Sequence, residues 1–129
     1  MGRLRVLLVD DEDDMRMLAR SALEDDGRFE VVGEGTNGAE AIVVAEREQP
    51  DVVLLDLEMP WLHGAEAVPG IVEVSPASFI ALWTVAPNSP RVPEALTLGA
   101  SAVIDKSWTT FGMLADRVIS LIGDATPVV

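Results

Sequence analysis

The chain holds 129 residues, 49% of them hydrophobic, which fits one compact domain with a core of its own. Twenty-two acidic residues oppose nine basic ones, and the resulting formal charge of −13 disfavours binding to nucleic acid or to an anionic membrane. Cysteine is absent, which excludes disulfides and thiolate metal sites, and the chain shows neither a signal-peptide pattern nor an apolar stretch of the roughly 18 residues that a membrane span needs. We therefore expect a cytoplasmic protein.

Short β-branched runs alternate with segments of helical period from the first residues onward. Residues 4–9 predict a strand that stops at the acidic cluster 10–14, and acidic residues suit the N-terminus of a helix. Apolar residues then recur on one helical face up to Gly27, a residue type that commonly ends helices. Residues 29–33 predict the second strand.

The middle of the chain repeats this alternation. Asn37 and Glu40 resemble a capping box, which predicts the start of a second helix that ends at Pro50. The run 52–55 has the strongest buried-strand pattern in the chain, and Asp56 stands at its C-terminal end. In α/β sheets this is the end where ligands bind.

The second half predicts three more helices and two more strands. A third helix over 65–74 is weakened by a proline and a glycine in its interior. Strands are expected at 79–83 and 102–105, with only a short helix between them because prolines recur over 87–93. Residues 109–122 predict a final amphipathic helix.

This order of elements predicts an α/β fold of the flavodoxin-like type. We expect a doubly wound, five-stranded parallel sheet with strand order 2-1-3-4-5 and five helices on its two faces. The expected domain covers residues 1–123, and residues 124–129 are expected to form a flexible tail.

Three carboxylates are expected to meet at one edge of this sheet. Asp10 and Asp11 follow the first strand and Asp56 ends the third, and these two strands are neighbours in the predicted order. A cluster of oxygen ligands suits Mg²⁺. An acidic run by itself is as typical of a solvated helix start. The position of Asp56 favours a metal site over a solvated helix start. It closes a buried strand, and burying a carboxylate without a partner costs several kcal/mol.

Thr84 and Lys106 follow the predicted fourth and fifth strands, at the same edge of the sheet. Lys106 is the only lysine in the chain, since every other basic residue is arginine. Its compact ammonium charge suits neutralising a phosphoryl oxygen, or pairing with Asp56 in an empty site. A single lysine without these partners is more typical of a solvated surface charge.

Four segments in this order resemble the signatures of response-regulator receiver domains, the CheY-like family: LLVDDE, LLDLEMPWLHG, ALWTVA and LGASAVIDKS. The resemblance covers residues 3–122. The segments FEVVGE and PDVVLLDLEMP, with Ser107 after the lysine, are most similar to the NarL/FixJ subgroup. Receivers of that subgroup usually precede a helix-turn-helix domain that regulates transcription. These 129 residues contain none, and two alternatives stay open: a complete single-domain regulator, or the front half of a longer DNA-binding one.

The resemblance implies a two-component phosphorelay in which a sensor histidine kinase or a phosphotransfer protein phosphorylates Asp56. Thr84 and Lys106 are then the residues that contact the phosphoryl group. The receiver supplies most of the catalysis of its own phosphorylation and dephosphorylation, through positioning and charge neutralisation, so it is not an enzyme in the usual sense.

The resemblance also assigns a cofactor and an output surface. Asp10, Asp11 and Asp56 match the Mg²⁺ ligands of the family, and Glu58 lies where the family supplies a backbone carbonyl to the metal. Partner binding, including formation of a homodimer, is expected on the face formed by the fourth helix, the fifth strand and the fifth helix.

Three features depart from the family pattern. Val103 replaces an aromatic residue that swings inward in most receivers; we expect a buried strand residue there, with coupling to the output surface weakened or rerouted. Val85 replaces a small residue, which predicts slow autodephosphorylation and poor use of small phosphodonors. The prolines of 87–93 restrict a helix that typically rearranges.

Two alternatives from other classes remain open. The departures at Val85, Val103 and 87–93 favour a receiver-like interaction or dimerisation module that signals without phosphate. A Mg²⁺ phosphohydrolase of the haloacid-dehalogenase type also uses an aspartyl phosphate, but Asp56 and Glu58 match its motif only loosely and the chain lacks the length for a cap domain.

Overall fold

The computed structural model describes residues 2–59, 64–107 and 109–125. Strands and helices alternate along this part of the chain, as the sequence predicts. The strands are β1 (Leu4–Val9), β2 (Phe29–Gly35), β3 (Val52–Asp56), β4 (Phe79–Thr84) and β5 (Ala102–Asp105). The helices are α1 (Asp13–Asp26), α2 (Gly38–Glu48), α3 (Gly64–Val74), α4 (Arg91–Leu98) and α5 (Phe111–Ala125).

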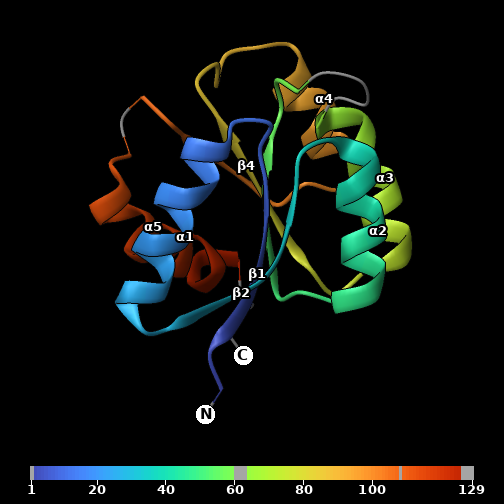
Figure 1. The fold of residues 1–129 in the computed structure, drawn as a ribbon. Helices are drawn as coiled ribbons and strands as arrows, with labels where there is room; N and C mark the ends of the chain where they lie inside the picture. The colour runs from blue at the N-terminus through green and yellow to red at the C-terminus, as the bar shows by residue number, and fades with distance from the viewer. Residues whose placement is uncertain (1, 60–63, 108, 126–129) are drawn as a thin grey trace.

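The five strands form one parallel sheet in the order β2-β1-β3-β4-β5. Helices α1 and α5 cover one face of the sheet, and α2, α3 and α4 cover the other (Figure 1). The predicted fold class and strand order are therefore confirmed. Because all strands run in the same direction, their C-terminal ends lie along one edge, and the crossover of the chain between β1 and β3 opens a ligand site there.

The central strands are buried on both sides, which explains their continuous apolar runs. Leu7 and Val9 of β1 pack under α2 and α3, whereas Val6 and Leu8 pack under α1 and α5. The residues of β3 divide between the two faces in the same alternating way. Two apolar cores thus hold β1 and β3 rigidly, and with them the residues at their C-terminal ends.

Helix α3 is continuous despite its two unfavourable residues. Pro69 lies on its exposed side, where its ring stays out of the core and the helix loses only one backbone hydrogen bond. At Gly70 a Cβ atom would lie 2.5 Å from Cδ1 of Ile42, so the glycine lets α3 pack closely on α2. Helix α4 has Pro93 in its first turn, where a proline is tolerated.

Two element boundaries differ from the expected ones. Strand β2 runs to Gly35 rather than to residue 33, because the carbonyl of Gly35 still accepts a hydrogen bond from the Asp10 amide at 3.0 Å. Helix α5 begins at Phe111, since the Thr109 amide instead closes a turn onto the carbonyl of Asp105, and it continues through Gly123 to Ala125. The first residues of the expected tail 124–129 are therefore helical, and 126–129 lie outside the described residues.

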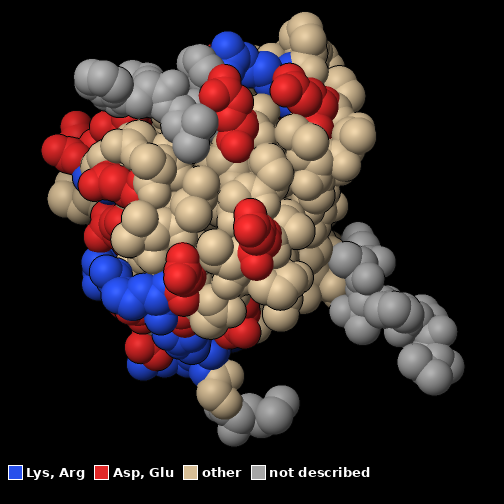
Figure 2. Space-filling view, turned by 90° about the vertical axis from the view of Figure 1, so that its right-hand side faces the viewer, with Lys and Arg blue, Asp and Glu red and all other residues tan. Residues whose placement is uncertain are grey.

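The surface over α2, α3 and α4 is largely uncharged. Acidic side chains are scattered over it, and basic side chains gather at its edges (Figure 2). None of the helices in the described ranges is long and apolar enough to cross a membrane.

Candidate functional site

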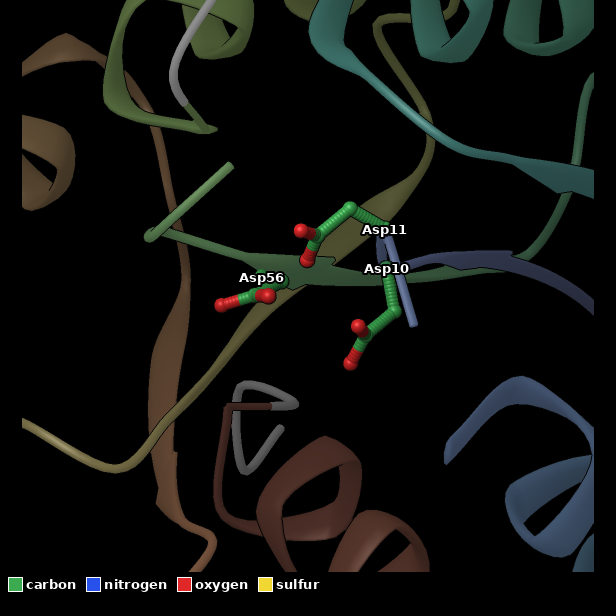
Figure 3. A group of neighbouring side chains, drawn as sticks. All are labelled: Asp10, Asp11 and Asp56. Carbon is green, nitrogen blue, oxygen red and sulfur yellow. The ribbon is translucent and has the colours of Figure 1, made fainter. Parts of the chain in front are cut away.

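Three carboxylates lie together at the C-terminal edge of the sheet. Asp10 and Asp11 directly follow β1 and Asp56 ends β3, and all three project into the same region (Figure 3). Each offers an oxygen atom within 4.8 Å of those of the other two. Asp10 and Asp56 are only 3% and 5% exposed, whereas Asp11 is open to solvent. The structure thus brings together the three residues that the sequence singled out as metal ligands.

Short turns fix the direction of the two buried carboxylates. Asp10 accepts a hydrogen bond on Oδ1 from the Glu12 amide at 2.9 Å, and Asp56 accepts one on Oδ1 from the Glu58 amide at 3.0 Å. Each aspartate therefore closes a turn with the backbone two residues further on, a pattern that suits aspartate. One oxygen of each side chain is held by its own loop, which leaves Oδ2 for other partners.

Lys106 supplies the positive charge at this cluster. Its Nζ donates a hydrogen bond to Oδ2 of Asp10 at 2.7 Å and lies 3.5 Å from Oδ2 of Asp56, with the lysine side chain only 9% exposed. Its backbone amide donates to the carbonyl of Thr84 at 2.8 Å. The sequence led us to expect the lysine beside Asp56, and the structure places it there but gives it Asp10 as the nearer partner.

Asp56 is the residue with the most perturbed acidity in the site. Burial raises its pKa to about 6; the Lys106 ammonium and the Glu58 amide oppose this rise, and the negative charges of Asp10 and Asp11 add to it. Three carboxylates face a single ammonium group, so the cluster carries excess negative charge at neutral pH. Its all-oxygen donor set, crowded and partly buried, fits a hard divalent cation.

Thr84 lies at the end of β4 with its side chain fully buried. Its Oγ1 accepts a hydrogen bond from the Ala86 amide at 2.9 Å, which leaves the hydroxyl proton free for donation. The Glu58 side chain is exposed to solvent. Val85, the first residue after β4, is 63% exposed.

The sequence did not indicate two further residues that contact the cluster. The Lys106 ammonium lies over the Trp83 ring, 5.6 Å from its centre. Arg16 of α1 donates from Nη1 to the backbone carbonyl of Asp10 at 2.6 Å and forms ion pairs with Asp13 and Glu34. In the sequence, Trp83 looks like any apolar strand residue and Arg16 like any charged residue of a helix.

Val103 lies on β5 and packs against the core under α3 and α4, as expected of a strand residue, but it is half-buried rather than buried. It also lines an open groove of about 610 Å³ on the β5–α5 side of the molecule. The other lining residues are Pro87, Asp105, Thr109, Met113 and Arg117. An aromatic side chain at position 103 has room in this groove.

Comparison with known proteins gives one consistent match. Residues 6–118 match the family model described as response regulator receiver domain. The chemotaxis protein CheY of Thermotoga maritima is 37% identical over 108 residues, which cover 84% of this chain and 88% of that protein. A protein-glutamate methylesterase/protein-glutamine glutaminase of Pseudomonas aeruginosa is 35% identical over 120 residues, 92% of this chain but 33% of that protein. The chain spans about a third of the length of the methylesterases that it matches.

Solved structures agree with this match. The response regulator domain of Thermotoga maritima CheB superposes with a TM-score of 0.84 at 31% identity, covering 95% of this chain and 96% of that one. The signal receiver domain of the putative response regulator NarL from Mycobacterium tuberculosis has a TM-score of 0.85 at 28% identity, covering 98% of this chain and all of that domain.

Proposed function

Because the chain belongs to the response regulator receiver domain family, we propose that Asp56 is its phosphoacceptor in a phosphorelay. The proposal rests above all on one observation. Asp56 ends the most buried strand of the sheet, is itself 5% exposed, and has Oδ2 at 3.5 Å from the only lysine in the chain. A histidine kinase or a phosphotransfer protein is the partner that a receiver domain implies.

Receiver domains bind Mg²⁺ at an acidic cluster, and this chain has such a cluster. We assign the metal to Asp10, Asp11 and Asp56, with the backbone carbonyl of Glu58 as a further ligand. The excess negative charge of the cluster and its all-oxygen donors support this assignment. When bound, the ion would neutralise the negative charge on the phosphoryl oxygens during transfer.

The residues of the chain itself position the reacting groups. Oδ2 of Asp56 attacks the phosphorus of a phosphohistidine; the new P–O bond gives an acyl phosphate as the P–N bond breaks, and the leaving imidazole nitrogen takes up a proton. Lys106 lies beside Oδ2, where its ammonium neutralises an equatorial phosphoryl oxygen. The Thr84 hydroxyl can donate its proton in a hydrogen bond to a second phosphoryl oxygen.

The output is a change in protein–protein contacts. We assign it to the face of α4, β5 and α5, where the groove beside Val103 lies, and to formation of a homodimer through that face. The chain itself is not assigned a nucleic-acid site, because its net charge of −13 repels phosphates. A regulatory role in transcription fits the likeness to NarL-type receivers and requires a DNA-binding domain elsewhere in the gene product. The place of action is the cytoplasm, where histidine kinases present their phosphohistidine.

Intact-mass spectrometry tests phosphoacceptance. The protein is incubated with Mg²⁺ and either phosphoramidate or a phosphohistidine-bearing phosphotransfer protein, and wild type should gain the mass of one phosphoryl group. Asp56→Asn and a chelator should both abolish the gain. Asp51→Asn is the matched control, since this exposed aspartate precedes β3 at the opposite end of the strand. A wild type that never gains mass would favour the module that signals without phosphate, and a gain retained in Asp56→Asn would refute the assigned residue.

A further inference from the structure

Trp83 is held rigidly beside the acidic cluster. It is the last residue but one of β4 and pairs in register with Asp56 of β3 and Ile104 of β5. Its side chain is 3% exposed, and its ring meets that of Phe111 edge to face, with the centres 6.4 Å apart. Sheet and helix α5 therefore both restrain the indole, which makes it a fixed platform at the end of the strand.

The Trp83 ring contacts the lysine of the acidic site. The Lys106 ammonium lies over the ring at 5.6 Å from its centre, within the range in which an aromatic face attracts a cation. Trp83 and Asp10 also line one small cavity of about 10 Å³, together with Leu8 and Met15. The indole thus lies under the ammonium of the closest ion pair in the site and lines the same small cavity as its carboxylate partner.

A buried ammonium needs such a neutral partner. The Lys106 side chain is 9% exposed, so its charge is largely cut off from water. Its two anionic partners, Asp10 and Asp56, are the carboxylates to which we assign a divalent cation. A metal ion on Asp10 competes with the ammonium for the same oxygens. An aromatic ring attracts the ammonium without offering a ligand that a hard divalent cation would take.

We propose that Trp83 is a positioning residue for Lys106: its ring keeps the ammonium over the site when the Asp10 carboxylate is engaged by a cation. The contact itself is independent of phosphorylation, whereas its use in phosphoryl transfer rests on the proposed function. Loss of the ring should let the lysine swing towards solvent once Asp10 is occupied, and transfer to Asp56 should slow down.

Nuclear magnetic resonance of the single lysine tests the contact directly. Selective ¹³C labelling of lysine gives one ε-methylene signal, since Lys106 is the only lysine. Its protons should be shifted upfield by the ring in metal-free protein and should stay upfield when Mg²⁺ is added. In Trp83→Leu they should move to the values of a solvated lysine on Mg²⁺ addition, and Trp83→Phe should give an intermediate shift.

Phe111→Leu is the matched control, because it removes the ring that packs on Trp83 and leaves the ring under the lysine. Its lysine signal should stay upfield with and without Mg²⁺. A wild-type signal at solvated values in either state would overturn the proposal. Because this readout needs no phosphodonor, it decides the contact even where Asp56 proves not to accept a phosphoryl group.

Fluorination of the indole separates positioning from packing. Trp61 and Trp108 are replaced by phenylalanine, and the remaining Trp83 is substituted with tetrafluorotryptophan, which keeps the shape of the ring but removes its negative face. We expect an unchanged melting temperature, a lysine signal displaced by Mg²⁺, and a phosphorylation rate lowered roughly three- to tenfold. An undisplaced signal and an unchanged rate would show that Trp83 only fills the core.

Discussion

The Lys106 ammonium donates a hydrogen bond to Oδ2 of Asp10 at 2.7 Å, closer than its 3.5 Å approach to Asp56. The lysine therefore neutralises the carboxylate that the sequence assigns to the metal as well as the one that it assigns to the phosphoryl group. A divalent cation must share Asp10 with this ammonium or displace it. Metal affinity and lysine position are consequently linked at this site.

Removal of the lysine charge should strengthen metal binding. In Lys106→Met we expect the dissociation constant for Mg²⁺ to fall roughly tenfold, about 1.4 kcal/mol, because no internal cation competes for Asp10. Isothermal titration calorimetry measures this constant, and Arg117→Met, which removes a charge from α5 beside the groove, is the control and should leave it unchanged. Weaker or equal Mg²⁺ binding in Lys106→Met would contradict the competition.

Asp56 should make stability depend on pH when no metal is present. Its pKa is about 6 in the folded protein against an ordinary 3.8, so the folded state holds a proton that the unfolded state releases between these values. Protonation therefore favours the folded state, and the ionised side chain lowers stability above pH 6. At pH 7 we expect Asp56→Asn to be more stable than wild type by about 2 kcal/mol.

Urea unfolding with a chelator, for both proteins between pH 7 and 4, measures this effect. The stability difference should shrink as the pH falls through 6 and should disappear near 4, because other titrating groups are common to both proteins. A stability difference that stays constant between pH 7 and 4 would show that burial does not raise the pKa of Asp56.

The sequence predicted the fold well because the pattern of the central strands is unambiguous. A run such as Val52–Asp56 has no polar residue before its last, which only a strand covered on both faces explains. The ends of α5 were harder to predict. Gly123 is a typical helix end, yet here the helix continues past it, and the turn closed by Thr109 delays the start of the helix by two residues.

The site was predictable as far as it depends on strand ends. Asp10, Asp56 and Lys106 follow strands that meet at one edge, so topology alone brings them together. The contacts of Trp83 and Arg16 depend instead on how long side chains cross neighbouring strands and loops. No spacing in the sequence encodes the direction of those side chains, so these two residues emerge only from the structure.

Arg16 should stabilise the loop that carries the acidic pair. Its guanidinium joins the Asp10 carbonyl to Asp13 and Glu34, and its side chain is 12% exposed. We expect Arg16→Ala to lose about 1–2 kcal/mol of stability and to bind Mg²⁺ several times more weakly, because the loop then has more freedom. Chemical unfolding and calorimetric titration measure the two effects.

Arg20→Ala is the control for this variant. Arg20 shares the partner Glu34 and is 44% exposed, but its ion pairs with described residues are to Glu24 and Glu34, away from the acidic loop. It should lose little stability and keep its Mg²⁺ affinity. Equal Mg²⁺ affinities for the two variants would show that the contact of Arg16 with the Asp10 carbonyl does not order the site.

Val85 should slow hydrolysis of the acyl phosphate. It directly follows Thr84 and is 63% exposed, so its branched side chain stands at the entrance from solvent. In Val85→Ala we expect autodephosphorylation to be roughly three- to tenfold faster, about 1 kcal/mol less barrier, and small phosphodonors to react faster too. Decay of the phosphorylated protein after donor removal gives the rate. Val43→Ala, equally exposed on α2, is the control, and equal decay rates in all three proteins would refute the role of Val85.

Val103→Tyr should restore coupling between phosphorylation and the α4–β5–α5 face. Val103 has no ring to move, and the groove of about 610 Å³ beside it has room for one. A tyrosine there can lie in the groove or turn inward, and this gives the face two arrangements that a phosphoryl group can bias. We expect the variant to dimerise several times more tightly when phosphorylated, with an unchanged rate of phosphorylation. Analytical ultracentrifugation with and without phosphodonor measures the dimer constant, and Val43→Tyr on α2 is the control. If phosphorylation shifts the dimer constant of Val103→Tyr no more than that of wild type, the valine does not limit the coupling.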